Sequence, residues 1–108
     1  MNRNIQLIEP EHFAKTRAKY MNNQQFRLFI DFLTTHPENG VVVKGTGGCR
    51  KIRWRYQHCG KTGGIRIIYY LTRHRAIHLM FIYVKNRQKE LTMKQRQACR
   101  AMVKLIAA

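Results

Sequence analysis

Residues 45–70, GTGGCRKIRWRYQHCGKTGGIRIIYY, contain two β-strand patterns joined by a glycine-rich connection. In the first pattern, basic residues alternate with large apolar ones: Lys51, Arg53 and Arg55 against Ile52, Trp54 and Tyr56. Successive residues of a strand face opposite sides of its sheet, so this stretch predicts a sheet with one basic face and one apolar face. The apolar face has to be covered by other parts of the chain, which makes this stretch the centre of the fold.

Further strands are predicted downstream of the glycine-rich connection. Residues 49–56, 65–71 and 77–84 are rich in β-branched and aromatic side chains, which indicates an antiparallel meander of three strands. A two-residue turn at His74 and Arg75 would place Arg66 opposite Tyr83 in the last two strands. Residues 4–8 could form an edge strand, and residues 41–44 could form either a short strand or a buried loop.

The first two strands of the meander are paired by setting Tyr56 opposite Ile65, which places Arg55 opposite Arg66 and Arg53 opposite Ile68. Both registers together predict a basic face with Lys51, Arg53, Arg55, Arg66, Tyr70, Tyr83 and Lys85. The opposite face would carry Ile52, Trp54, Ile65, Ile67, Met80, Ile82 and Val84. Three apolar residues would also lie on the basic face: Ile68, Leu79 and Phe81. A concave surface with an apolar floor and a basic rim suits a single-stranded nucleic acid, whose bases stack while its phosphates meet cations.

Helical patterns flank the predicted meander. A first helix is expected from Pro10 towards Met21, and a second from the Asn22 cap to about Thr35. The second helix should bury a stripe made of Phe26, Phe29, Ile30 and Leu33, widened by Leu28 and Phe32. A capping box at residues 92–95 starts a final helix over residues 93–107, with Ala98, Cys99, Met102, Val103 and Ile106 as its apolar face. The expected fold is therefore α+β: two N-terminal helices packed on a small antiparallel sheet, with a C-terminal helix.

Length and charge constrain the class of protein. The 108 residues suffice for a single domain, and the formal net charge is +16. Residues 39–89 carry twelve basic side chains and no acidic one, which indicates a polyanionic partner. No apolar run approaches the roughly 20 residues that span a bilayer, and the first ten residues lack a signal-peptide core, so we expect a cytoplasmic protein without membrane contact.

Two kinds of site are disfavoured by spacing. The cysteines Cys49, Cys59 and Cys99 form no CxxC pair, and with His58 they match no common zinc pattern, so we expect reduced thiols and neither metal nor other cofactor. Residues 60–62, GKT, resemble the end of a P-loop, but the required earlier glycine is replaced by Arg55. The histidines do not converge on the predicted basic face, with the one open case of His58.

Three blocks of the sequence are similar to the RelE/ParE toxin superfamily, and most closely to its HigB-like branch. The blocks are residues 45–55, 60–70 and 82–92, and they occur in the family's order and spacing. The resemblance implies a RelE-like fold and the toxin of a type II toxin–antitoxin pair. Such toxins cut mRNA in the decoding site of the ribosome without a cofactor, by attack of the RNA 2′-hydroxyl on the adjacent phosphate. The implied partners are a cognate antitoxin, the small-subunit RNA of the ribosome, and mRNA.

The resemblance also implies roles for individual residues. Lys51 and Arg53 occupy the paired basic positions, and Arg66 occupies the strongly basic position of the following strand. The family's later arginine and tyrosine fall near Gln88 and Thr92, so the identity of the general acid stays open among Lys85, Arg87 and Tyr83. The predicted catalytic set is Lys51, Arg53, Arg66, Lys85 and Tyr83. The predicted RNA-binding set is Arg50, Arg55, Lys61, Tyr70, Arg87 and Lys89. Two alternatives remain: a non-enzymatic ParE-like inhibitor of DNA gyrase, and a plain RNA- or ribosome-binding protein.

Overall fold

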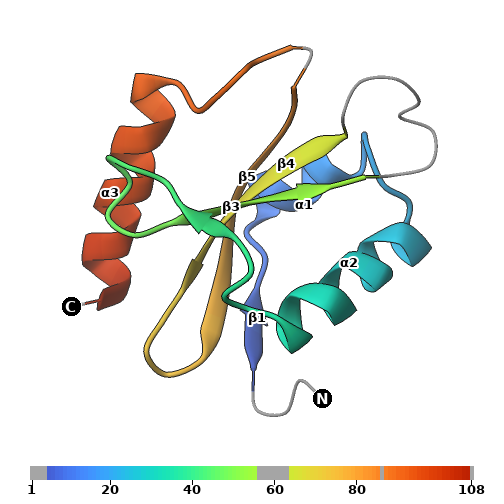
Figure 1. Cartoon of the computed structure of the whole chain (residues 1–108), viewed down its shortest axis with the longest axis horizontal. Coiled ribbons are helices and arrows are strands. Elements are labelled where there is room, and N and C mark those ends of the chain that lie inside the picture. Colours follow the sequence, from blue (N-terminus) through green and yellow to red (C-terminus); the bar gives the residue numbers. More distant parts are fainter. Residues whose placement is uncertain (1–4, 56–63, 86, 108) are drawn as a thin grey trace.

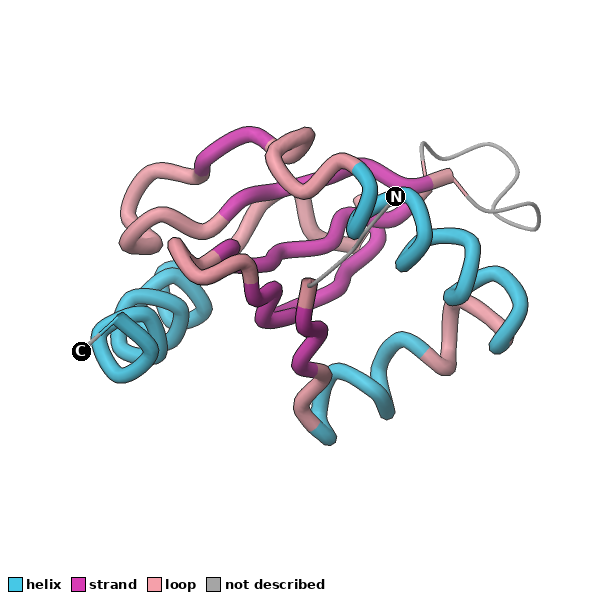
Figure 2. The backbone as a smooth tube through the Cα atoms, turned by 90° about the horizontal axis from the view of Figure 1, so that it is seen from below, coloured by secondary structure: helices cyan, strands magenta, loops and turns pink. Residues whose placement is uncertain are grey.

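A five-stranded mixed sheet in the order β1-β5-β4-β3-β2 lies between two layers of helices (Figures 1 and 2). The computed structural model describes residues 5–55, 64–85 and 87–107. Its strands are β1 (Gln6–Ile8), β2 (Val41–Val42), β3 (Arg50–Trp54), β4 (Ile65–Leu71) and β5 (Ala76–Val84). Its helices are α1 (Glu11–Arg17), α2 (Asn23–Thr35) and α3 (Met93–Ala107). The α+β class, the two N-terminal helices and the C-terminal helix are confirmed. None of the described helices is long and apolar enough to cross a membrane.

The two edge strands differ in direction. β2 pairs antiparallel with β3, with Val41 opposite Lys51, so the short segment before the glycine-rich loop is a strand. β1 pairs parallel with β5, with Gln6 opposite Ala76. The expectation of a purely antiparallel sheet is therefore wrong at this edge. A three-residue strand carries no pattern that specifies its direction, which is decided by the edge on which it docks.

The β3–β4 register differs from the predicted one by two residues. Arg53, rather than Arg55, lies opposite Arg66, and Trp54 lies opposite Ile65. A two-residue displacement leaves every side chain on its predicted face, because the side-chain period of a strand is two. At the end of the pair, Gly64 has φ +79°, and a Cβ there would lie 2.6 Å from the Trp54 carbonyl oxygen. Only glycine fits this approach, and it fixes where β4 begins.

The turn between β4 and β5 is one residue longer than predicted. Thr72 N–H donates to the Ala76 carbonyl at 2.8 Å, and Ala76 N–H donates back to Thr72 Oγ1 at 3.0 Å. The loop between them ends on Arg75, whose φ is 63°. A three-residue hairpin loop commonly ends on a residue in this left-handed conformation.

A β-bulge farther along the same strand pair compensates for the longer turn. Ile68 lies opposite Phe81 while Tyr69 lies opposite Leu79, which leaves Met80 as the extra residue. Beyond the bulge, Arg66 lies opposite Tyr83 as predicted. Between the turn and the bulge, each side chain of β5 lies on the face of the sheet opposite to the predicted one. The predicted faces of Leu79 and Met80 are therefore wrong. Leu79 packs with α1 and α2, and Met80 packs on the α3 side.

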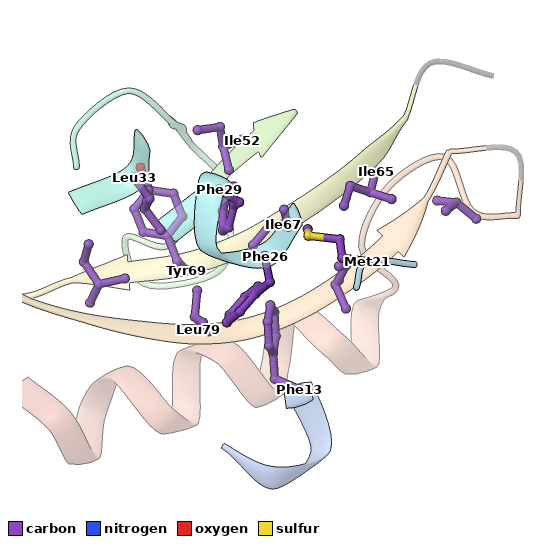
Figure 3. Close-up of a cluster of buried hydrophobic side chains, with 13 residues drawn as sticks. Phe13, Met21, Phe26, Phe29, Leu33, Ile52, Ile65, Ile67, Tyr69 and Leu79 are labelled. Carbon is purple, nitrogen blue, oxygen red and sulfur yellow. The ribbon is translucent and has the colours of Figure 1, made fainter. Parts of the chain in front are cut away.

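The larger core lies between the sheet and the helices α1 and α2 (Figure 3). The Asn22 side chain accepts from Gln25 N–H and the Gln25 side chain accepts from Asn22 N–H, so the predicted start of α2 is confirmed. The α2 stripe buries Phe26, Phe29 and Leu33, whereas Ile30 and Phe32 are partly buried. Leu28 is 59% exposed, so the prediction that it widens the stripe is wrong. The first helix also ends earlier than predicted, at Arg17, and Met21 reaches the core from the connection between the helices.

A second core lies on the opposite face of the sheet, under α3. Thr92 and Gln95 form the predicted capping box, with both hydrogen bonds at 3.0 Å. The helix buries Cys99 and Val103 against Ile68, Met80 and Tyr83, among others. Met102 is 44% exposed and Ala98 is exposed, so the predicted apolar face is too wide. α3 therefore covers part of the face that the sequence predicts to be basic.

Cys49, just before β3, and Cys99, in α3, are both fully buried. The neighbouring Cys99 thiol and burial raise the pKa of the Cys49 thiol, so Cys49 stays protonated. Because the thiolate is the reactive form and a reagent must reach the sulfur, we expect the buried, protonated Cys49 to be alkylated by iodoacetamide at pH 8 at least tenfold more slowly in the native protein than in urea. Mass spectrometry of the Cys49 peptide measures the rates, and equal rates in both conditions would contradict this arrangement.

Candidate nucleic-acid interface

A row of basic and phenolic residues crosses the three central strands on the face that carries α3. Arg53 on β3 lies opposite Arg66 on β4, which in turn lies opposite Tyr83 on β5. Lys51 lies on the same face, two residues along β3, opposite Ile68. Residues directly opposite in neighbouring strands have Cβ atoms about 4.5–5.5 Å apart, so this register brings the four side chains Lys51, Arg53, Arg66 and Tyr83 together.

The four side chains Lys51, Arg53, Arg66 and Tyr83 differ in exposure. Arg66 is 4% exposed and Tyr83 is 5% exposed, whereas Arg53 is exposed and Lys51 is half-buried. Burial raises the pKa of Tyr83, and the nearby Arg66 and Arg96 cations only partly oppose this. Its phenol is therefore neutral around pH 7. Among the described residues, the Tyr83 hydroxyl is the buried side-chain polar atom without a hydrogen-bond partner.

A pocket of about 250 Å³ opens beside Lys51 and Tyr83. One wall is the strand and loop at residues 41–44, and the other consists of Glu90 and Leu91, which precede α3, and Arg96 of α3. Ile68 forms part of its floor. The pocket thus joins residues from three distant parts of the sequence, and the alternation pattern of β3 and β4 does not predict it.

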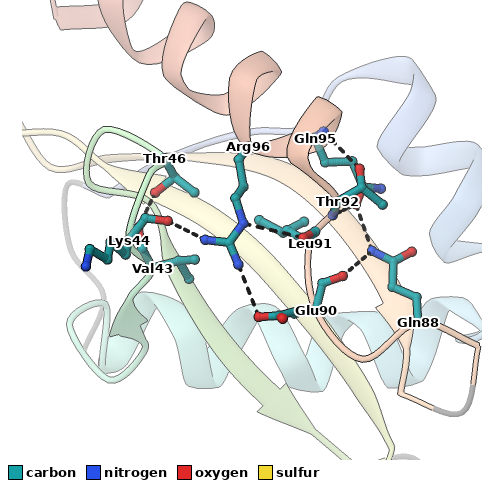
Figure 4. Close-up of polar contacts among 9 residues, drawn as sticks. All are labelled: Val43, Lys44, Thr46, Gln88, Glu90, Leu91, Thr92, Gln95 and Arg96. Atoms are coloured by element: carbon teal, nitrogen blue, oxygen red, sulfur yellow. Dashed lines mark hydrogen bonds and ion pairs between the residues drawn. The ribbon is translucent and has the colours of Figure 1, made fainter.

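Arg96 holds the pocket together (Figure 4). Its guanidinium donates through Nη1 to the Lys44 carbonyl, through Nε to the Leu91 carbonyl at 3.4 Å, and through Nη2 to Glu90 Oε1 at 3.2 Å. Gln88 Nε2 also donates to the Glu90 carbonyl at 3.0 Å. Arg96 therefore ties the first turn of α3 to the loop after β2 and is not merely a solvated cation of the helix. Its partner Lys44 lies 52 residues away in the sequence, and no local pattern reports such a contact.

The other predicted residues lie beyond the ends of this row or elsewhere in the fold. Four of them are exposed, at the end of β3 and after β5: Arg55, Lys85, Arg87 and Lys89. Tyr70 lies near the other end of the sheet and lines a separate pocket with Ile106 of α3. Lys61 lies outside the described residues. The structure therefore separates Tyr70 from the row.

Arg50 has a different environment from Lys51. It lies opposite Tyr69, whose side chain belongs to the α1/α2 core. Its Nη1 donates to the Glu38 carbonyl at 3.1 Å and to the Gly40 carbonyl at 2.8 Å, and so fastens the connection between α2 and β2. Arg50 is therefore not brought together with the row, because neighbouring residues of a strand face opposite sides.

The side chains that could ligate a metal are scattered in the part of the chain that the structure describes. No group of three or more His, Cys, Asp or Glu residues could hold a metal ion there. His12 lies on α1, and its Nε2 is 2.9 Å from the Met80 carbonyl oxygen. His58, the open case from the sequence, lies outside the described residues. The arrangement therefore offers fixed positive charge and one neutral phenol around a pocket.

No protein-family model matches the chain. Among solved structures, a mutant of the E. coli toxin RelE in the free state is similar, with a TM-score of 0.57 and 16% sequence identity. The similarity covers 80% of this chain and 88% of the other. At this level of identity the likeness concerns the fold, and the chain has a RelE-like α+β fold.

Proposed function

We propose that this protein is the toxin of a type II toxin–antitoxin pair and that it cleaves mRNA in the decoding site of the ribosome. The observation that carries the proposal is the row Arg53, Arg66 and Tyr83, with Lys51 beside it, on one face of a RelE-like sheet. A buried arginine next to a neutral tyrosine on a strongly basic face suits phosphoryl transfer. The resemblance of the sequence blocks to HigB-like toxins supports the same function.

In the proposed reaction, the 2′-hydroxyl of the RNA loses its proton to water and attacks the adjacent phosphate. The bond from phosphorus to the 5′-oxygen of the next nucleotide breaks, which leaves a 2′,3′-cyclic phosphate and a 5′-hydroxyl end. Lys51 and Arg53 would bind the phosphate, and Arg66 would stabilise the negative charge of the phosphorane. Tyr83 is favoured over Lys85 and Arg87 as the general acid, because its neutral hydroxyl has no partner among the described residues and can donate to the leaving 5′-oxygen.

The proposed dependence on the ribosome follows from the limited catalytic power of the side chains in the row. The row offers fixed positive charge and a neutral phenol, so positioning and charge would supply most of the rate. Alignment of the 2′-hydroxyl with the phosphate lowers the activation barrier of such reactions substantially. The decoding site would provide this alignment. The basic face would bind ribosomal RNA outside the active site, and a cognate antitoxin would cover or distort this surface.

Brief expression in bacteria, followed by sequencing of new 5′-hydroxyl ends, tests the proposal. We expect the wild type to produce such ends within translated regions, and Lys51→Ala to reduce them about 10²-fold, because a positioned catalytic cation is lost. Lys15→Ala is the matched control: it removes the same charge from α1, where the side chain is 77% exposed.

The alternatives predict different results from the same cultures. Intact messages with halted DNA replication would identify a gyrase inhibitor. Ribosome association without new ends would identify a plain RNA-binding protein. Equal cleavage by Lys51→Ala and Lys15→Ala would show that Lys51 is not part of the active site.

A further inference from the structure

The pocket beside Lys51 contains an unexpected negative charge. From residue 39 to the end of the chain there is a single acidic residue, Glu90, among 16 basic ones. Its side chain lines this pocket together with Lys51 and Tyr83. A carboxylate next to a phosphate-binding row repels phosphate, so its position there calls for a ligand group other than phosphate.

The ion pair with Arg96 does not explain why an acidic residue lies in this pocket. Oε1 accepts from Arg96 Nη2 at 3.2 Å, but the Glu90 side chain is 72% exposed. An ion pair at such exposure adds little to stability. Arg96 already donates to two backbone carbonyls, those of Lys44 and Leu91, so its position does not depend on Glu90. The pair instead orients a carboxylate that is still accessible from the pocket.

The rest of the pocket suits a flat, partly apolar group. Its walls include Val42, Val43 and Leu91, and its floor includes Ile68. At about 250 Å³ it is smaller than the roughly 300–1,000 Å³ of pockets that enclose drug-sized ligands, so it would hold a single heterocycle. Tyr83, the proposed general acid, also lines the pocket, which sets the pocket next to the bond that would be cleaved.

We propose that this pocket binds one nucleobase next to the cleaved bond and that Glu90 selects guanine. This inference rests on the proposed function. Guanine presents two adjacent donors, N1–H and the N2 amino group, which a carboxylate accepts together. Adenine and cytosine present a single amino group on the same edge, and uracil presents a single imino N–H. Glu90 is therefore a specificity residue, and Arg96 is its positioning residue.

The test is the base composition around the mapped 5′-hydroxyl ends. We expect wild-type ends to favour guanine at one position that flanks the cut, and Glu90→Gln to reduce the ratio of guanine to uracil there about tenfold, since a good bidentate contact discriminates by this order. Glutamine keeps an oxygen for Arg96 but loses one of the two acceptors. Glu38→Gln is the matched control, because it removes the same charge from an exposed residue that lies outside the pocket.

Each other outcome overturns a defined part of the proposal. Wild-type cleavage without a base preference, or the same base profile for Glu90→Gln and the wild type, would overturn base recognition and leave the proposed function standing. Loss of all cleavage in Glu90→Gln at an unchanged melting temperature would make Glu90 part of catalysis and overturn its assignment to specificity. Absence of new ends with the wild type would overturn the proposed function and base recognition together.

Discussion

Arg66→Ala is expected to reduce mRNA cleavage about 10²–10³-fold, the largest loss of activity that we expect from a single substitution. Arg66 is 4% exposed and lies between Arg53 and Tyr83 in the row, so its charge acts where water is largely excluded. A fixed cation in such a place stabilises the phosphorane more than an exposed one does. Cleavage is measured with purified protein on programmed ribosomes, by primer extension across the message.

Two further variants separate the role of Arg66 in catalysis from its role in folding. Arg27→Ala removes the same charge from an exposed position of α2, and we expect full activity. Arg66→Lys keeps the buried charge without the planar fork of arginine, and intermediate activity is expected. Melting temperatures of all three variants show whether Arg66→Ala still folds. Unchanged cleavage and growth arrest with a folded Arg66→Ala would show that the site assignment is wrong.

Phe29→Ala is expected to lower the free energy of unfolding by about 3–5 kcal/mol, as for other large aromatic residues replaced in a core. Phe29 is fully buried on α2, and its ring packs edge-on against Trp54 with 5.1 Å between centroids. Small domains are stable by only about 5–15 kcal/mol, so this variant should be close to unfolding at 37 °C. Urea unfolding followed by tryptophan fluorescence measures the change, since Trp54 is the chain's single tryptophan.

The neighbouring residue provides the control for this prediction. Leu28 lies on the same helix but is 59% exposed, so Leu28→Ala should change the stability by no more than about 0.5 kcal/mol. Similar losses for Phe29→Ala and Leu28→Ala would contradict the orientation of α2 on the sheet.

Features that depend on neighbouring residues were predictable from the sequence. The alternation at residues 50–54 placed Lys51 and Arg53 on one face and Ile52 on the other, because the strand period is local. The cap at Asn22 and the capping box at Thr92 were predictable for the same reason, since each involves residues three positions apart. The fold class followed from these elements taken together.

Features that depend on contacts between distant residues were not predictable. The bulge at Met80 exchanged the faces of Leu79 and Met80, because a longer turn and an extra residue in β5 compensate for each other and leave no trace in the alternation. The side of the sheet that α3 covers was also open, since Cys99 and Val103 form an apolar stripe that suits either face.

The sequence by itself determined the basic and apolar faces of the central strands and the helices that flank them, because period and capping are properties of short segments. Only the tertiary structure decided which basic residues meet. It set Arg53 opposite Arg66, and it brought Arg96 and Glu90 to the pocket beside Lys51. The physical reason is that strand register and helix docking are settled by packing between residues far apart in the chain, which the order of neighbouring residues does not encode.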